Sequence, residues 1–192
     1  MRAFLQDLKT SVRLTLSLAL LLCGMYPLLV WGIGQITFPT EANGGLIKRS
    51  DSVVGSNLIG QTFTANRYFH SRPSAAGQGY DGSSSSGSNL GPTSKKWVDA
   101  VTERVKIYRF VNGLDETIKI PGDAVLASAS GLDPHISPEN ACLQMARVAR
   151  ERGLNVSEVE TFIQIHTVKP WFGFMGDPGV NVLELNLSLD KK

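Results

Sequence analysis

The chain is poor in the residues that mark several protein classes. It has 2 cysteines in 192 residues, too few for a disulfide framework or a cysteine-rich zinc site. Its 3 histidines, His70, His135 and His166, are isolated and lack the spacing of a metal site. Only 19% of the residues are charged while 42% are apolar, which excludes a disordered chain. The length predicts one domain.

Sequence patterns for catalysis and nucleotide binding are absent or out of context. Residues 77–82 match G-x-G-x-x-G, but Arg72–Ser74 and a serine run flank them where a strand and a helix are needed. The chain has no G-x-x-x-x-G-K-[ST] loop and no G-x-S-x-G elbow. We therefore predict no catalytic residue, no metal ligand and no cofactor held by this chain.

One long apolar run is present, from Leu14 to Ile33, and it contains no charged residue. Roughly 20 helical residues span ~30 Å, the thickness of the hydrocarbon core of a bilayer. Trp31 suits the membrane interface, and Pro27 is tolerated in membrane helices. The run exceeds the ~7–15 residues of a signal-peptide core, and no Ala-x-Ala site follows it. The sequence predicts a retained transmembrane helix over residues 14–33.

The flanking charges predict the orientation of this helix. Three cations precede it, namely Arg2, Lys9 and Arg13, and Asp7 is the only anion there. The next cations, Lys48 and Arg49, lie at the limit of the range over which the positive-inside bias acts. We expect residues 1–13 in the cytoplasm and residues 34–192 in an extracytoplasmic, periplasmic domain. Cations and anions balance beyond residue 13, so the charge does not indicate a nucleic-acid partner.

Helical and strand-like patterns both occur in the exported part, which predicts a small α+β fold of helices and short strands. Expected helices are residues 95–111 capped by Thr93 or Ser94, residues 138–153, and a third beginning at a capping box, Ser157–Glu160. The second helix should bury Cys142, Met145, Val148 and Ala149, and the third Val159, Phe162 and Ile163. Expected strands are 57–63, 118–121, 124–127 and the alternating leucines of 183–189. Residues 39–54 read as a connection and 77–92 as a flexible loop.

Ordered motifs run through the exported part of the chain. The main ones are Gly55–Phe63, Tyr68–Ser74, Ser86–Thr93, Ala127–Ser137 and Asn181–Leu187, with Gln144 and Arg147–Ala149 between the last two. Together with the apolar helix, they resemble the C subunit of the bacterial Kdp potassium-transporting ATPase over nearly the whole chain. The serine run at residues 83–86 is longer than that family leads us to expect.

The resemblance implies a non-catalytic accessory subunit in the bacterial inner membrane. Its implied partners are a P-type ATPase subunit, a channel-like potassium-binding subunit and a small membrane peptide, so the complex rather than this chain handles ATP and the potassium ion. The family has also been proposed to act as a catalytic chaperone that raises ATP affinity, a role linked to the position of Gln144. The predicted topology opposes contact with cytoplasmic ATP and favours a cap on the outer face of the channel-like subunit. Gln144 is alternatively a polar residue on the helix opened by Pro138, either solvated or capping a neighbouring group.

Five polar residues of the motifs lie in turn-rich sequence, where a scaffold presents contact groups. They are Arg72, Tyr80, Asn89, Asp133 and His135. We expect them on one face, packed on each other or on the partner's extracytoplasmic surface, while Gly91, Pro92, Gly131 and Pro134 shape the backbone. A free-standing membrane-anchored binding module and an exported hydrolase remain the alternative functions.

Overall fold

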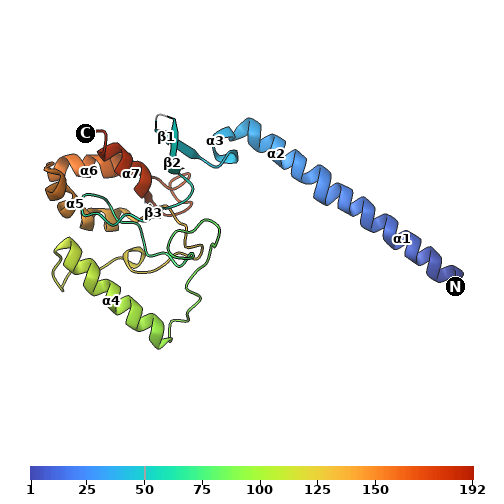
Figure 1. Ribbon diagram of the computed structural model, residues 1–192, viewed down its shortest axis with the longest axis horizontal. Coiled ribbons are helices and arrows are strands. Elements are labelled where there is room, and N and C mark those ends of the chain that lie inside the picture. The colour runs from blue at the N-terminus through green and yellow to red at the C-terminus, as the bar shows by residue number, and fades with distance from the viewer. Residues whose placement is uncertain (50) are drawn as a thin grey trace. The chain divides into compact units, whose positions relative to one another are not determined.

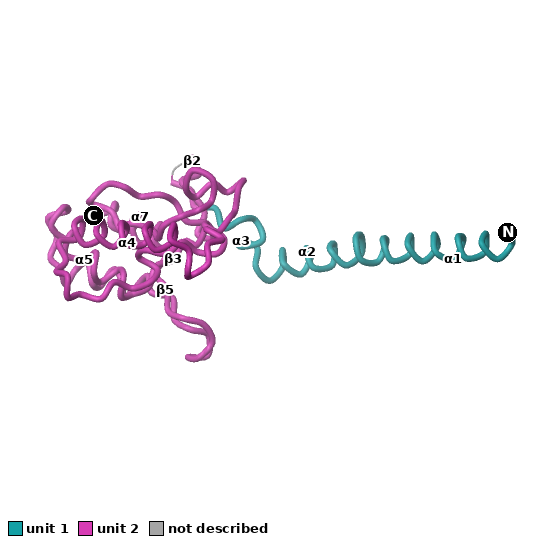
Figure 2. The backbone as a smooth tube through the Cα atoms, turned by 90° about the horizontal axis from the view of Figure 1, so that it is seen from below, with its two compact units in different colours: residues 1–46 teal, residues 47–192 magenta. Residues whose placement is uncertain are grey.

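The computed structural model describes residues 1–49 and 51–192, which divide into two units, Met1–Leu46 and Ile47–Lys192 (Figure 2). In the first unit one helix runs without interruption through α1 (Arg2–Ala19), the π-helical turn η1 (Leu20–Met25) and α2 (Tyr26–Thr37). The short helix α3 (Pro39–Ala42) follows it. Within the described part, Arg2–Thr37 is the one helix long and apolar enough to cross a membrane.

The π-helical turn ends at Met25, two residues before Pro27. Proline has no N–H to donate, and its ring crowds the carbonyl four residues earlier, here that of Cys23. Widening the preceding turn relieves this clash, and such π-bulges are a common response inside helices. The helix therefore continues through Pro27, as expected for the apolar run, and extends beyond residues 14–33 on both sides.

The second unit combines helices with short strands, which confirms the α+β prediction (Figure 1). Its helices are α4 (Lys95–Asn112), the 3-10 turn η2 (Gly122–Ala124), α5 (Pro138–Arg152), α6 (Val156–Ile165) and α7 (Val182–Leu189). A two-stranded sheet pairs β1 (Leu46–Arg49) with β2 (Ser52–Ser56). A three-stranded antiparallel sheet has the order β3 (His135–Ile136), β5 (Gly179–Asn181), β4 (Thr167–Val168).

The hydrophobic core lies where α5, α6 and α7 pack together over the central strand β5. Val180 of β5 is fully buried and pairs with Ile136 of β3 and Thr167 of β4. The core side chains are Phe69, Ile136, Ala141, Val148, Ala149, Val159, Ile163, Val180, Val182, Leu185 and Leu189. Helix α4 packs against α5, so α5 is the element that connects the core to the rest of the unit.

The two helices predicted at residues 95–111 and 138–153 are confirmed as α4 and α5. Ser137 caps α5 by accepting from the Asn140 N–H at 3.1 Å, and Gly153 ends it in the left-handed conformation. Val148 and Ala149 are buried as expected, but Cys142 is exposed. The prediction for Cys142 was wrong because the buried side of α5 is centred on Ala141 and Val148.

The third predicted helix is confirmed, but its start was misplaced by two residues. The capping box is formed by Asn155 and Glu158, not by Ser157 and Glu160, and α6 begins at Val156. Asn caps a helix as well as Ser does, and Glu158 accepts from the Asn155 N–H at 3.2 Å. The helix phase is unaffected, since Val159 and Ile163 are buried and Phe162 packs against the core.

The predicted strand over the alternating leucines is wrong, because residues 182–189 form the helix α7. Asn181 caps this helix by accepting from the Glu184 N–H at 3.1 Å. Its buried side includes Val182, Leu185, Asn186 and Leu189, which follow helical spacing. The leucines at 183, 185, 187 and 189 coincide with that spacing only in part, and leucine favours helix in any case.

The other predicted strands are also absent from these described segments. Residues 57–63 form a turn, a single bridge and irregular backbone, while 118–121 and 124–127 form loop and the 3-10 turn η2. The Gly60 N–H donates to the Leu132 carbonyl at 2.9 Å, so the first segment pairs with a loop rather than with a strand. The supposed connection at 39–54 contains α3, β1 and β2, apart from residue 50, which lies outside the described residues.

The segment 77–92 is a series of turns and irregular backbone. The G-x-G-x-x-G match at 77–82 follows a bend and precedes further turns, which is not the strand and helix that a dinucleotide needs. Two hydrogen bonds attach the end of its serine run to Ser130: the Ser86 N–H and the Ser85 hydroxyl both donate to the Ser130 carbonyl, at 3.0 Å each.

Candidate docking site

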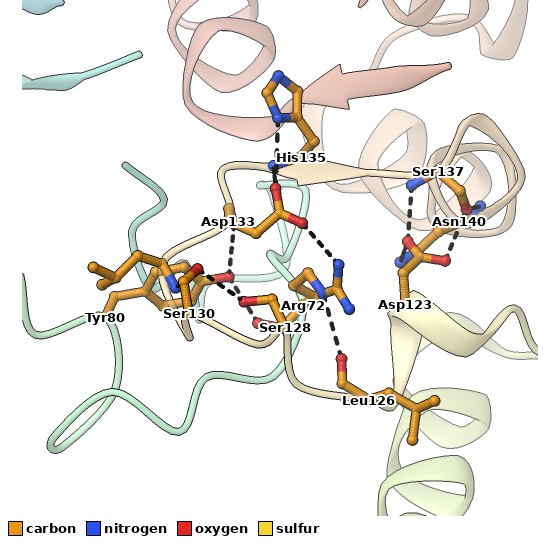
Figure 3. Close-up of polar contacts among 11 residues, drawn as sticks. Arg72, Tyr80, Asp123, Leu126, Ser128, Ser130, Asp133, His135, Ser137 and Asn140 are labelled. Atoms are coloured by element: carbon orange, nitrogen blue, oxygen red, sulfur yellow. Dashed lines mark hydrogen bonds and ion pairs between the residues drawn. The ribbon is translucent and has the colours of Figure 1, made fainter. Parts of the chain in front are cut away.

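Arg72 and Asp133 form the centre of a polar cluster between two irregular segments of the second unit (Figure 3). The Arg72 Nη1 atom lies 2.7 Å from the Asp133 Oδ2 atom, and both side chains are partly buried. The Asp133 Oδ1 atom accepts from the His135 N–H at 3.0 Å and lies 3.5 Å from His135 Nδ1. One carboxylate thus joins residue 72 to the beginning of β3.

Tyr80 completes this cluster from a third segment. Its hydroxyl donates to the Arg72 carbonyl at 2.9 Å and lies 3.4 Å from the Asp133 carbonyl. Burial, more than any other cause, raises the pKa of Tyr80 to about 12, so the phenol keeps its proton and acts as a donor. The Tyr80 N–H donates to the Ser74 hydroxyl at 2.8 Å, and Ser74 in turn donates to the Gly131 carbonyl at 2.6 Å.

The charge of Asp133 is stabilised by its neighbours. Burial alone raises the pKa of Asp133, but the hydrogen bonds from His135 and the hydrogen bond and positive charge of Arg72 outweigh burial and lower it to about 2. Asp133 is therefore ionised at neutral pH and provides two acceptor oxygens. The Arg72–Asp133 ion pair therefore links the two irregular segments that carry these residues.

Asn89 is the one of the five predicted residues that the structure does not bring to this cluster. It is exposed in the serine- and glycine-containing loop and has a left-handed φ of 52°. Asparagine is among the few side chains that adopt this conformation readily. Asn89 is thus an exposed residue of irregular backbone, whereas Arg72, Tyr80, Asp133 and His135 contact one another.

Asp123 forms a second acidic centre beside the cluster, and the sequence analysis did not identify it. Its carboxylate accepts from the Ser137 N–H at 2.8 Å, the Ser137 hydroxyl at 2.9 Å and the Asn140 side chain at 2.8 Å (Figure 3). A cavity of about 440 Å³ opens here, with Arg72, Asp123, Asp133, His135 and Asp177 among its lining residues. Tertiary structure alone places these carboxylates around one cavity, because they come from separate segments and belong to no sequence motif.

Gln144 is buried, with 1% of its surface exposed. Its carboxamide oxygen accepts from the His70 N–H at 2.7 Å and from Arg147 Nη2 at 2.9 Å. Its carboxamide nitrogen donates to the His70 carbonyl at 3.1 Å and to Asn140 Oδ1 at 2.9 Å. The amide therefore uses both acceptor and both donor positions. Gln144 is therefore not solvated, and its side chain bonds neighbouring groups inside the domain.

Arg147 lies one helical turn beyond Gln144 and is also 1% exposed. Its guanidinium donates to uncharged oxygens: Asn112 Oδ1 and the Tyr68 carbonyl, both at 2.9 Å, the Asn66 carbonyl, and Gln144. Burial is the main cause that lowers the pKa of Arg147 to about 10, which leaves it charged at neutral pH. The signal for this network was an arginine, a glutamine and an asparagine spaced at 147, 144 and 140 along one helix.

A parallel contact is made by Asn186 of α7. Its side chain accepts from the Phe69 N–H at 2.9 Å and donates to the Phe69 carbonyl at 3.0 Å. Side-chain amides from α5 and α7 thus pair the backbone of residues 69 and 70, as a neighbouring strand would. The segment that leads to Arg72 is thereby held in place, so the buried amides position the polar cluster.

Within the described part of the chain, no group of three or more His, Cys, Asp or Glu side chains is arranged to hold a metal ion. Both cysteines are free and exposed. The loops of this domain are braced by ion pairs, buried amides and a buried arginine. Such loops present a defined surface to a partner.

An apolar N-terminal helix joined to a small, internally braced α+β domain is consistent with a membrane-anchored subunit. The family model described as KdpC: K+-transporting ATPase, c chain, matches residues 8–191. The chain belongs to this family, whose members are subunits of the potassium-transporting ATPase.

Curated relatives agree with the family match. A potassium-transporting ATPase KdpC subunit of Mycobacterium tuberculosis is 53% identical over 167 residues, covering 87% of this chain and 88% of the relative. The protein of the same name from Koribacter versatilis is 50% identical, covering 96% of this chain and 94% of the relative. That from Nitratidesulfovibrio vulgaris is 51% identical, covering 95% and 92%. The family resemblance inferred from the motifs is confirmed.

Proposed function

We propose that this chain assembles and stabilises an ATP-driven potassium import complex and carries out no catalysis itself. Family membership supports a role as a subunit and weighs against a free-standing binding module or an exported hydrolase. The proposed partners are the P-type ATPase subunit, the channel-like potassium-binding subunit and a small membrane peptide. ATP and potassium ions are then handled by those partners.

The proposed location is the bacterial inner membrane, with residues 1–13 in the cytoplasm and the domain in the periplasm. The cations before the apolar run, Arg2, Lys9 and Arg13, support this orientation through the positive-inside rule. In this topology the domain forms a cap on the outer face of the channel-like subunit. The surface around the Arg72–Asp133 cluster, together with exposed Asn89, is the proposed contact region.

One observation favours assembly over a direct effect on ATP affinity: the Gln144 carboxamide is buried and uses all four of its hydrogen-bonding positions inside the domain. A nucleotide could contact this amide only after α5 separated from the segment at His70. We therefore propose that Gln144 supports the fold on which docking depends. The catalytic-chaperone role is the alternative, and it requires the same residue to be accessible.

Two experiments test the proposal. Affinity purification of the tagged full chain from detergent-solubilised membranes should recover the larger ATPase and channel-like subunits, and recovery of the chain alone would contradict it. Alkaline phosphatase fused after Lys192 should be active, because that enzyme needs an oxidising compartment outside the cytoplasm. Activity only from a cytoplasmic reporter at the same position would reverse the topology and bring the domain within reach of ATP.

A further inference from the structure

The loop that joins β4 to β5 carries an exposed apolar tip. Trp171, Phe172, Phe174 and Met175 are all more than half exposed, and Phe172 reaches 82%. The loop leading into β5 projects from the rest of its unit (Figure 2). Single exposed apolar residues are ordinary, but a contiguous group of this size marks a surface that contacts a protein or a membrane.

The loop is a defined hairpin and not an unstructured tail. Trp171 and Met175 exchange two backbone hydrogen bonds, of 3.0 and 2.9 Å, and the Gly173 N–H donates to the Pro170 carbonyl at 3.1 Å. Phe172 turns the chain in the left-handed conformation, with φ of 53°. Because the tip pairs most of its own backbone groups, it can leave water at a lower cost than an open loop.

The aromatic rings of the tip contact each other. The centroids of Trp171 and Phe172 lie 6.4 Å apart, and those of Phe172 and Phe174 lie 6.5 Å apart. No charged residue occurs between Lys169 and Asp177, which flank the tip. This composition of tryptophan, phenylalanine and methionine, with a lysine at the base, is typical of segments that rest in the headgroup region of a bilayer.

The short connection between the apolar helix and the second unit favours a lipid bilayer as the surface that the aromatic tip contacts. The apolar helix ends at Thr37 and the second unit begins at Ile47. The intervening residues 38–46 reach at most about 30 Å even when fully extended. A domain on so short a tether samples the membrane surface at a high effective concentration. Even a low affinity of the apolar loop for lipid is therefore sufficient for a second attachment to the membrane.

We propose that residues 169–178 insert their aromatic tip into the lipid headgroup region of the leaflet that faces the domain. This attachment orients the domain relative to the membrane, which a single helix on a short linker does not do. The proposal rests on the proposed membrane anchor but not on which side of the membrane the domain occupies.

The test uses the three tryptophans of the full chain, Trp31, Trp97 and Trp171, one at a time. In each variant the other two are replaced by phenylalanine, and the full chain is placed in nanodiscs of phosphatidylcholine and phosphatidylglycerol with or without bromine on the acyl chains. We expect brominated lipid to quench Trp171 and its emission to lie to the blue of that of Trp97, which belongs to α4. Trp31 reports on the anchor.

The three single-tryptophan variants distinguish the proposed lipid contact of the loop from the proposed membrane anchor. If brominated lipid quenches Trp31 but quenches Trp171 no more than Trp97, the proposed lipid contact is wrong and the membrane anchor stands. Quenching of Trp171 without Trp31 supports the loop and contradicts the anchor. If Trp171 is protected only when the other subunits are present, its partner is a protein and the proposal is wrong.

A loop variant provides the matched control. Phe172→Ser combined with Phe174→Ser should abolish the quenching of Trp171 while leaving the thermal unfolding of the chain unchanged. Phe110→Ser, which removes a similarly exposed phenylalanine from α4, should leave the quenching unaltered. Equal effects of the loop and α4 variants would contradict the proposal.

Discussion

The side chain of Gln144 bonds both backbone polar groups of His70, which lies 74 positions earlier, accepting from its N–H at 2.7 Å and donating to its carbonyl at 3.1 Å. Asn186 makes the same pair of bonds to Phe69. Two side-chain amides thus replace a strand partner for residues 69 and 70. This irregular segment needs no sheet, because side-chain amides already satisfy the backbone groups of residues 69 and 70.

Replacing Gln144 with Leu should destabilise the domain, at about 1–3 kcal/mol for each buried polar group left unpaired. Thermal unfolding of the full chain in detergent measures this loss, and the yield of the purified complex should fall with it. Arg150→Ala, on the exposed side of the same helix, is the control and should change neither. For whatever complex assembles, the ATP concentration that gives half-maximal ATPase activity should not change. An altered ATP dependence in a normally stable variant would instead support the chaperone role.

Replacing Asp133 with Asn should weaken the contacts with Arg72 and His135 and lower the free energy of unfolding by about 1–2 kcal/mol at neutral pH. Partial exposure of the pair keeps this loss small. Because the folded pKa is about 2 and the unfolded pKa about 3.9, the charge contributes fully above about pH 4. Its contribution is then lost as the pH falls towards 2. The difference in unfolding free energy between parent and variant, measured in urea, should shrink over that window. Asp99→Asn, at an exposed position of α4, should show no such difference.

Complex yield decides whether this cluster also docks. If Asp133→Asn and Arg72→Ala lower the yield while the chain still unfolds cooperatively near its normal temperature, the cluster contacts a partner. If both variants lose cooperative unfolding, the cluster is an internal brace and the proposed contact region is wrong.

Replacing Gly131 with Ala should be much more damaging than replacing Gly153. Both glycines have a left-handed φ, of 69° and 66°, which costs another residue about 1–2 kcal/mol. A Cβ atom at Gly131 would also lie 2.5 Å from the Ser86 carbonyl oxygen and 2.7 Å from the Ala76 nitrogen, whereas one at Gly153 meets nothing within 4 Å. We expect losses of about 2–5 and 1–2 kcal/mol respectively. Equal losses in denaturant titrations would show that the close approach at Gly131 relaxes without cost.

Replacing Leu21 with Arg should remove the chain from the membrane fraction. Residue 21 is near the middle of the apolar run, where an arginine costs about 2.5–3.5 kcal/mol on insertion scales. Leu5→Arg, in the part expected to lie in the cytoplasm, is the matched control and should leave the chain in the membrane. Immunoblots of fractionated cells provide the measurement. Normal membrane content and normal complex yield for Leu21→Arg would show that the segment is not an anchor.

The elements that sequence predicted best are those whose pattern is local. The apolar run, α4 and α5 each have a repeating hydrophobic pattern or a clear end signal, such as Ser137-Pro138 before α5 and Gly153 after it. The short strands β3, β4 and β5 are two or three residues long. A period of two is not visible in so few residues, so these strands could not be found from sequence. The helix α7 was mistaken for a strand because its four leucines alternate with polar residues, while the helical spacing of its buried side also involves Val182 and Asn186.

The site residues likewise divide into those that local sequence indicated and those that it did not. Arg72, Tyr80, Asp133 and His135 were selected from sequence because polar heads in turns often make specific contacts, and the structure brings these four together. Asp123 and Arg147 were missed as site residues because their partners lie on other elements, 14 to 81 positions away. For Asp123, nothing in the neighbouring residues indicates such contacts, and for Arg147 the local sign is the polar series that it forms with Asn140 and Gln144 along α5.

The sequence by itself determined the apolar helix, the long helices of the domain and the family, since these depend on periodicity, end signals and ordered motifs within short stretches. Only the tertiary structure decided that Gln144 and Arg147 are buried, that side-chain amides hold the segment before Arg72, and that 182–189 is a helix. The physical reason is the cost of burying a polar group. Each buried N–H, carbonyl or guanidinium needs a partner, and the partner becomes known only when distant parts of the chain meet.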